Sequence, residues 1–204
     1  MRLPPSRDEE FRSNINMLRK DLAVINDRFL SSQTVKLRLS GVGALTKGQA
    51  LELGLVGLAA RASGVALDAR AYPGRGAYRD PAILPVTMNG GDCWSRARIR
   101  IEEIDASLAW LTAILDRNPV WESQRKVIGP LKADRFVVAM VEGWRGEVIH
   151  CLETDASGGF AHYKVQDPSF RNWMGLAIAV RGNEISDFPI CNKSFDLSYC
   201  GHDL

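Results

Sequence analysis

The chain has 204 residues, of which 46% are hydrophobic and 25% are charged, as is usual for a soluble globular domain. Its 26 basic and 24 acidic residues nearly cancel, which argues against a nucleic-acid-binding protein, because such a protein needs a clustered basic excess. No apolar run approaches the roughly 20 residues that span a bilayer, so the composition also argues against direct membrane insertion.

Two long helices are predicted by apolar residues that recur at alternating steps of three and four. The first helix covers residues 8–30, and charged residues occupy its other faces. The second helix begins at Asp92, a residue type that commonly caps a helix N-terminus, and ends at Asn118-Pro119. We expect the two helices to pack against each other or against a further chain.

Four shorter segments lie between the long helices. Residues 35–39 alternate between apolar and polar side chains, which is typical of a short strand. Residues 46–53 begin with the Thr-x-x-Gln spacing of a capping box and are predicted to be a short helix. A further short helix is predicted at 56–63, and residues 72–85, rich in proline and glycine, are interpreted as an ordered loop.

After Pro130 the apolar period changes from helical to two. Three antiparallel strands are predicted, at residues 136–142, 147–153 and 160–166. Gly-containing turns at 143–146 and 156–159 connect them. A helix is predicted at 169–180, and residues 185–204 are interpreted as a mixed, largely polar tail.

The fold class that follows from these elements is α+β, a long-helix bundle with a small antiparallel β-sheet. Residues 1–130 are expected to form a helical bundle lobe. Residues 131–204 are expected to add the hairpin sheet, a C-terminal helix and the tail. We find no internal repeat and no low-complexity segment.

The four cysteines, Cys93, Cys151, Cys191 and Cys200, form no C-x-x-C pair, so no zinc-ribbon, iron–sulfur or thioredoxin pattern is present. With no secretory signal at the N-terminus, they are expected to be reduced thiols in the cytoplasm. Cys191, Cys200 and His202 make a C-x8-C-x-H cluster, but zinc sites use tighter pairs and four ligands, so a metal site is the less favoured interpretation.

Five short strings, in the same order and at similar separations, resemble the nickel–iron-hydrogenase-like large subunit that respiratory complex I and energy-converting hydrogenases share. Together they cover nearly the whole chain and match the C-terminal half of that subunit. The strings are GVG at 41–43 with Leu45, AARASGV at 59–65 with Asp68 and Arg70, GDCWSR at 91–96 with Arg100, Glu102 and Glu103, EGWRGE at 142–147, and DPSFRN at 167–172.

The tail departs from the hydrogenase pattern at the metal ligands. In nickel–iron hydrogenases a C-terminal D-P-C-x-x-C motif supplies two thiolates, and oxygen ligands or hydrogen do not replace them. Here Ser198 and Gly201 stand where the cysteines are expected, Cys200 is one residue out of register, and Leu197 replaces the proline. The resemblance therefore predicts that the nickel–iron centre is absent and that this chain holds no cofactor.

The resemblance implies part of the large subunit of a membrane-associated respiratory oxidoreductase that is similar to complex I or formate hydrogenlyase. Its partners would be an iron–sulfur small subunit, the N-terminal half that is missing here, and antiporter-like membrane subunits. The chain would provide scaffold and cavity wall for electron transfer to quinone or a related acceptor, on the cytoplasmic side of the inner membrane. Iron–sulfur clusters, quinone and NADH binding are expected on or with other subunits, and no activity is expected alone. The alternative is an inactive assembly or interaction module that keeps the fold.

Arg145, Asp196 and Glu142 are the candidate catalytic residues. By resemblance, Arg145 matches the arginine beside the hydrogenase metals, but an exposed arginine in a tight hairpin is equally compatible with the sequence. Asp196 matches the aspartate of the metal motif and is interpreted either as part of a proton relay or as a turn residue. Glu142 and Glu147 flank Arg145 and are candidates to pair with it across the hairpin.

A set of further charged residues is predicted to form a structural network. The resemblance favours a buried ion network that joins the lobes, whereas charges on helices most often lie on a solvated face. The residues are Arg61, Asp68, Asp92, Arg96, Glu102, Glu103 and Glu147.

Overall fold

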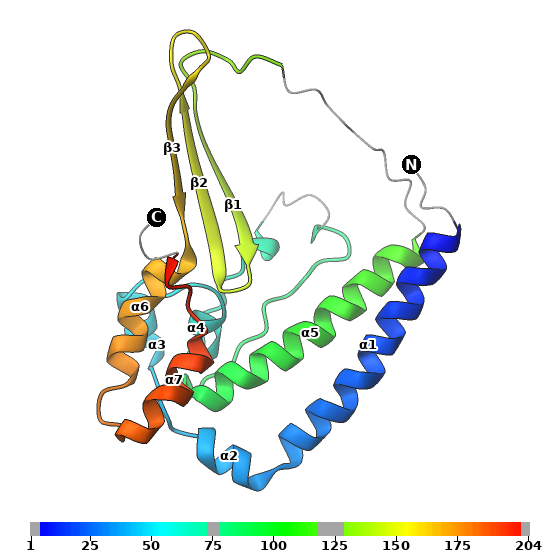
Figure 1. Ribbon diagram of the computed structural model, residues 1–204, viewed down its shortest axis with the longest axis vertical. Coiled ribbons are helices and arrows are strands. Elements are labelled where there is room, and N and C mark those ends of the chain that lie inside the picture. Colours follow the sequence, from blue (N-terminus) through cyan, green and yellow to red (C-terminus); the bar gives the residue numbers. More distant parts are fainter. Residues whose placement is uncertain (1–4, 73–77, 118–128, 201–204) are drawn as a thin grey trace.

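The computed structural model describes residues 5–72, 78–117 and 129–200, with the side chains described from residue 7. Two long helices, α1 (Pro5–Ser31) and α5 (Cys93–Asp116), lie side by side (Figure 1). Phe29 of α1 stacks on Trp94 of α5 at 5.6 Å between ring centroids, and Arg12 pairs with Asp116 at the other end. Both predicted helices are confirmed, and they pack against each other.

The start of α5 is fixed by Asp92. Its carboxylate accepts hydrogen bonds from the backbone N–H of Ser95 and from that of Gly41, both at 2.8 Å. The first of these is the predicted N-cap, and the second ties the segment before α3 to the start of α5. Asp92 is therefore a structural residue that joins two segments distant in sequence.

The short elements between the long helices differ from the prediction at one place. Residues 35–39 are not a strand, because they belong to the helix α2 (Gln33–Leu39), which Ser32 caps by accepting a hydrogen bond from Val35 N at 3.4 Å. Five alternating residues are too few for the apolar period to separate the two structures. The capping box of Thr46 opens α3 (Lys47–Glu52) as predicted, and α4 (Gly57–Ala62) follows it.

The three predicted strands form one antiparallel sheet in the order β1-β2-β3. The strands are β1 (Phe136–Gly143), β2 (Gly146–Thr154) and β3 (Phe160–Gln166). In the register of β1 and β2, Gly143 lies opposite Gly146, so Trp144 and Arg145 form a two-residue hairpin turn. Figure 1 shows this turn inserted among the helices, whereas the other end of the sheet projects away from them.

The C-terminal part contains more helix than the sequence pattern predicts. Asp167 caps α6 (Pro168–Ala179), which confirms the predicted helix. The tail then forms a short 3-10 turn, η3 (Ile185–Asp187), and a helix, α7 (Phe188–Phe195), where a mixed polar segment was expected. Another 3-10 turn, η1 (Ala69–Ala71), follows α4.

The main hydrophobic core lies between α3, α4, α6, α7 and the start of α5. Its members include Leu45, Leu55, Ala60, Leu176 and Phe195, all nearly inaccessible to solvent. The structure confirms the α+β class, while the division into two lobes at residue 130 stays a prediction. Within the described residues, no helix is long and apolar enough to cross a membrane.

Candidate functional site

The hairpin turn that carries Trp144 and Arg145 is held by backbone contact with α4. Gly57, at φ +61°, lies so close to Arg145 and Gly146 that a side-chain carbon there would overlap their backbone. Gly146 itself has φ +136° and is buried against Val56 and Gly57. A glycine is therefore required on each side of this contact, which sets the hairpin directly on the first residue of α4.

Asn172 of α6 stabilises the same contact through hydrogen bonds to both Val56 and Arg145. Its side-chain oxygen accepts a hydrogen bond from Val56 N at 3.1 Å, and its amide nitrogen donates to Val56 O and to Arg145 O. Asn172 is 1% exposed, and its two hydrogen bonds to Val56 are buried. Asn172 was not among the predicted site residues, although it ends the DPSFRN string, and that string was the only signal for it.

Arg145 contacts the segment that follows α7. Its Nε donates to the backbone carbonyl of Asp196, and its Nη2 lies 3.6 Å from the Asp196 carboxylate. The Arg145 side chain is about one-third exposed. The arginine is therefore neither a free surface residue nor fully buried, and it joins the hairpin to the tail.

Asp196 is the meeting point of the hairpin and α7. Trp144 Nε1 and Lys193 Nζ donate to its two carboxylate oxygens at 3.1 and 2.6 Å. Burial raises the pKa of this carboxyl, but the hydrogen bonds from Lys193 and Trp144 outweigh it, so the pKa of Asp196 is lowered overall. Asp196 also ends α7 with φ +55°, which places it at a helix terminus as the turn interpretation predicts.

A buried arginine, Arg61 of α4, binds three carboxylates. It lies 2.6 Å from Glu103 and 2.8 Å from Glu142, and its distance to Asp68 is 3.8 Å. Arg61 is 2% exposed. Burial lowers the pKa of Arg61, but the charges of Glu103 and Glu142 more than compensate, so its pKa is raised and the cation is fixed.

The pKa values of two carboxyls in this network are shifted in opposite directions. For Glu142, burial is the largest influence and exceeds the attraction of Arg61, so its pKa is raised. For Asp68, burial also raises the pKa, but hydrogen bonds from Arg70 outweigh it and the pKa is lowered. Of these two carboxyls, burial therefore favours the protonated form of Glu142, whereas Arg70 favours the ionised form of Asp68.

The structure corrects the predicted pairing across the hairpin. Glu142 does not pair with Arg145; it binds Arg61 and accepts a hydrogen bond from Ala69 N at 2.9 Å. Glu147 does not pair with Arg145 either, because it binds Arg171 of α6 at 2.8 Å. Both side chains extend from the strands to helices that pack against the sheet. There, Arg61 of α4 and Arg171 of α6 provide the positive charges.

The predicted charged network therefore divides into separate parts. Arg61, Asp68 and Glu103 are brought together as expected. Arg96 is fully buried elsewhere, where it donates to the carbonyls of Gly91 and Gly43. Glu102 pairs with Arg98 one turn away on α5 with both side chains partly exposed, so the solvated interpretation is correct for it.

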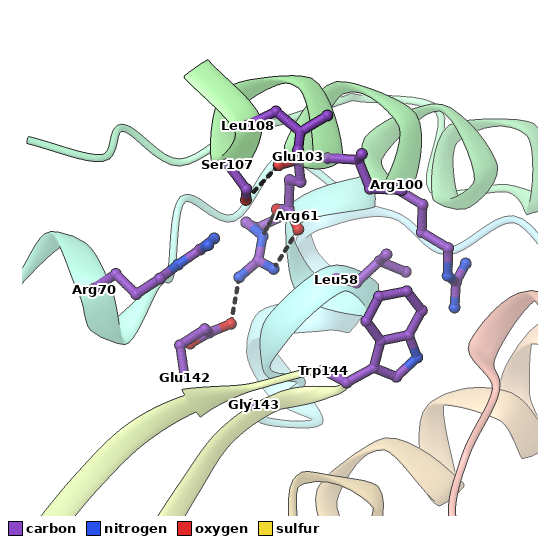
Figure 2. A pocket seen from close by; sticks show the side chains of 11 residues that line it. Leu58, Arg61, Arg70, Arg100, Glu103, Ser107, Leu108, Glu142, Gly143 and Trp144 are labelled. Carbon is purple, nitrogen blue, oxygen red and sulfur yellow. Dashed lines mark hydrogen bonds and ion pairs between the residues drawn. The ribbon is translucent and has the colours of Figure 1, made fainter. Parts of the chain in front are cut away.

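Two hollows meet at Trp144. The first, a cavity of about 290 Å³ that several charged residues help to line, lies beside the Arg61 network (Figure 2). The apolar groove, of about 660 Å³, lies between α1, α5 and α7. Its wall includes Ile25, Phe29, Ile101, Arg100, Trp144 and Asp196. Arg145 lines neither hollow among the described residues, and it acts on the groove only through Asp196.

Arg100 of α5 belongs to both hollows. Figure 2 shows its side chain reaching past Trp144, and its guanidinium carbon lies 6.0 Å from the Trp144 ring centroid. Burial lowers the pKa of Arg100, against the raising effect of Asp196. Within the described residues, no carboxylate forms an ion pair with Arg100. Its one side-chain hydrogen bond in that part of the chain is donated to Arg96 O at 3.3 Å. Arg100 was named only as part of a matching string, so its position is a finding of the structure.

The described residues that the resemblance aligns with the hydrogenase metal motif offer other groups than the thiolates of that motif. Ser198 uses its backbone N–H on Ser169 Oγ and its carbonyl on Trp173 Nε1, and Cys200 is exposed. Gly201 and His202 lie outside the described residues. In the described part of the chain, no three His, Cys, Asp or Glu side chains gather closely enough to share a metal ion. Hydroxyl and backbone groups are poor substitutes for bridging thiolates.

Comparison with known proteins gives a consistent result. A family model described as the 49 Kd subunit of respiratory-chain NADH dehydrogenase matches residues 1–136. The membrane-bound hydrogenase subunit alpha of Pyrococcus furiosus is 32% identical over 197 residues, which cover 89% of this chain and 46% of that protein.

Two further relatives come from different kinds of complex. Formate hydrogenlyase subunit 5 of Escherichia coli strain K12 is 29% identical over 92% of this chain and 33% of that protein. An NADH-quinone oxidoreductase subunit from Photorhabdus laumondii is 26% identical over 95% of this chain and 37% of that protein. The chain thus spans less than half the length of each of these curated relatives.

Proposed function

Because the chain belongs to the family of the respiratory-chain NADH dehydrogenase 49 Kd subunit, which is related to hydrogenase-like large subunits, we propose that it is part of a membrane-associated respiratory oxidoreductase. Within that complex it supplies scaffold and one wall of a cavity from which electrons pass to quinone or a related acceptor. Its partners are an iron–sulfur small subunit, the remaining part of the large subunit and antiporter-like membrane subunits. It is peripheral to the membrane and reaches it through these partners.

The observation that carries the proposal is the apolar groove where Arg100, Trp144 and Asp196 meet. Ile25, Phe29 and other apolar side chains provide a surface for a flat or hydrocarbon-like molecule. Arg100 supplies hydrogen-bond donors that no described carboxylate occupies, and a quinone carbonyl is an acceptor of the kind they suit.

The Arg61 network gives this wall its rigidity. It holds Glu142 at the base of the hairpin, one residue away from the Gly143–Gly146 pair that brackets Trp144 and Arg145. Because Arg61 and its carboxylates come from α4, α5, β1 and the segment before η1, the hairpin is fixed to several elements at once. A site built on such a fixed element keeps its geometry during turnover.

The first test is co-purification. The tagged natural gene product is isolated from membranes of its own host, and the accompanying chains are identified by mass spectrometry. Recovery of an iron–sulfur small subunit together with antiporter-like membrane subunits supports the proposal. Recovery of the chain with unrelated proteins contradicts it.

The second test is the Arg145→Ala variant in the assembled complex. Arg145 positions Asp196 at the groove, so we expect turnover to fall about tenfold or more, since misplacing a wall residue by about 1 Å has effects of this size or larger. Assembly, followed by co-purification yield, is expected to persist. Arg98→Ala is the matched control, because Arg98 pairs with Glu102 on the outer face of α5 and lines neither hollow. Unchanged turnover in Arg145→Ala would remove Arg145 from the site.

A second candidate function is an interaction module that keeps the fold without electron transfer. The loss of the metal-binding cysteines at Ser198 and Gly201 favours it. It predicts stable binding to a partner and no change in that partner's redox activity when Arg145 or Arg100 is replaced. Loss of turnover in the Arg145→Ala complex with intact assembly would exclude this alternative.

A further inference from the structure

Cys93 and Cys191 lie together in the core, although they belong to helices far apart in the chain. Cys93 is the first residue of α5 and Cys191 is in the middle of α7, and they are 1% and 0% exposed. Their two thiols share a hydrogen bond, and neither is in a disulfide. Cys93 is part of the wall of the apolar groove, but in the described part of the chain neither thiol forms a hydrogen bond with the hairpin residues Trp144 and Arg145.

Polar groups converge on Cys93 and leave Cys191 as its partner thiol. Arg96 Nη2 lies 3.5 Å from Cys93 Sγ, and Ser194 Oγ lies 3.4 Å from it. Arg96 is itself held by hydrogen bonds to Gly43 O and Gly91 O, so its charge stays beside the sulfur. Cys93 also occupies the N-terminus of a 24-residue helix, where the helix dipole favours a negative charge.

The two thiols consequently differ in acidity. The hydrogen bond from Cys191, followed by the charge of Arg96, outweighs burial and lowers the pKa of Cys93 to about 6. The same hydrogen bond and burial raise the pKa of Cys191. The remaining charged groups that influence the pair are Asp92, which acts on Arg96, and Asp187, which acts on Cys191. At neutral pH, Cys93 is the nucleophilic thiolate and Cys191 carries the proton.

Access to Cys93 comes through the apolar groove. Cys93 and Ser194 are part of its wall, whereas Cys191 is not among the residues that line it. The groove, of about 660 Å³, has room for a molecule as small as hydrogen peroxide beside Cys93. The neighbouring thiol then lies within hydrogen-bonding reach of the oxidised sulfur.

We propose that Cys93 and Cys191 form an oxidisable dithiol site, which takes a small peroxide from the apolar groove and closes to a disulfide between α5 and α7. The Cys93 thiolate attacks one peroxide oxygen, the O–O bond breaks, and a sulfenic acid and hydroxide form. Cys191 then loses its proton to the hydroxide and attacks the Cys93 sulfur, and the second oxygen leaves as hydroxide and takes up a proton. Two thiols and one hydrogen peroxide thus give one disulfide and two waters.

The disulfide would act on the groove through α7. Lys193 and Asp196 lie just after Cys191, and both line the groove. Asp196 binds Lys193, and it also accepts from Trp144 and Arg145 of the hairpin. Joining α7 covalently to the start of α5 fixes this wall. The chemistry needs only the chain's own thiols and a peroxide, so the proposal stands or falls independently of the electron-acceptor role.

The test is peptide mapping of the purified chain after exposure to hydrogen peroxide at pH 7. Remaining thiols are blocked with N-ethylmaleimide, and the chain is digested with trypsin without reduction. The expected product joins the peptide of residues 80–96 to the peptide of residues 182–193, with the loss of two hydrogens. Recovery of these two peptides unlinked, under conditions that oxidise the exposed Cys200, overturns the proposal.

A pair of variants separates the two roles. In Cys191→Ala the sulfenic acid of Cys93 has no partner thiol, so we expect Cys93 to be trapped by dimedone and no linked peptide to form. Cys151→Ala is the matched control, and it is expected to keep the link because Cys151 lies on β2. The pH at which iodoacetamide labels Cys93 at half the maximal rate is expected near 6 in the parent and higher in Cys191→Ala. A labelling rate that rises only near the ordinary thiol pKa in both proteins contradicts the assignment of Cys93 as the nucleophile.

Discussion

The two ends of the three-stranded sheet differ in how much the rest of the chain packs against them. At the hairpin end, Glu142 binds the buried Arg61 and the Gly143–Gly146 turn rests on Gly57. At the other end, Phe136 and Phe160 are 66% and 71% exposed, although both are large apolar side chains. The hairpin end is fixed by the packing of this chain. The far end carries apolar residues that the described part of the chain does not cover, as expected for a subunit surface.

The hairpin end is therefore the end of the sheet on which the fold of this chain depends. Removing one partner of a buried ion pair leaves an uncompensated charge. Adding a side chain at a glycine that contacts backbone creates an overlap. Exposed apolar side chains can be replaced with little effect on folding. Substitutions at the two ends should therefore change the free energy of unfolding by very different amounts.

The largest effect is expected for Arg61→Met. The variant leaves Glu142, Glu103 and Asp68 without their shared cation, two of them nearly inaccessible to solvent. Breaking a buried ion pair by removing one partner costs about 3–5 kcal/mol, and urea unfolding measures this loss. Arg98→Ala, which breaks an exposed pair on α5, is the control and should change stability by about 0–1 kcal/mol. Equal losses in the two variants would show that Arg61 is not the anchor of the hairpin.

Gly57→Ala should be the next most destabilising. The added carbon meets the backbone of Arg145 and Gly146, and overpacking of this kind costs about 1–3 kcal/mol. The left-handed conformation at φ +61° adds roughly 1–2 kcal/mol. Gly54→Ala is a close control, because Gly54 has φ +63° but nothing within 4 Å of the added carbon. The difference between the unfolding temperatures of Gly57→Ala and Gly54→Ala measures the contact of the hairpin with α4. Equal unfolding temperatures would mean that the hairpin moves away from α4 without cost.

A smaller effect, dependent on pH, is expected for Glu142→Gln. The pKa of Glu142 is raised above its ordinary value of 4.5, so the folded chain holds this proton more tightly than the unfolded chain. The stabilising contribution of that proton is fully present below pH 4.5 and is lost as the pH rises through the higher folded pKa. The parent should therefore lose stability relative to Glu142→Gln across this window, by about 1.4 kcal/mol for each unit by which the pKa is raised.

The lowered pKa of Asp68 does not obscure this comparison. Its contribution is present above its ordinary value of 3.8 and is lost as the pH falls through the lower folded pKa, so it acts below the Glu142 window. It also occurs in both proteins. Urea unfolding of the two proteins between pH 4 and pH 8 gives the difference, and a constant difference throughout would contradict the raised pKa.

The smallest effect on stability is expected at the far end of the sheet. Phe136→Ser and Phe160→Ser remove exposed side chains, and changes of this kind usually alter stability by about 0.5 kcal/mol or less. Thermal unfolding measures stability, and co-purification from host membranes measures assembly. A large loss of stability would mean that the far end packs within this chain after all. Weaker assembly with unchanged stability would identify it as a partner surface.

Much of the secondary structure could be predicted because it depends on local pattern. The long helices follow from apolar residues at steps of three and four, and the N-caps at Asp92 and Asp167 are satisfied by backbone N–H groups two or three residues away. The hairpin follows from alternation around the glycine-flanked turn at 143–146. The helix α2 was missed because five residues do not distinguish its period from that of a strand, and α7 was missed in a polar tail.

The family membership also came from the sequence, whereas the partners of the charged residues did not. Sequence proximity suggested that Glu142 pairs with Arg145, but the tertiary structure gives it Arg61, which lies on another element. Asn172, Arg100 and the Cys93–Cys191 pair gained their positions in the same way. The physical reason is that caps, turns and helix faces are satisfied within a few residues. Buried charges and thiols are instead paired by whichever elements the hydrophobic core brings together, and only the folded chain decides which those are.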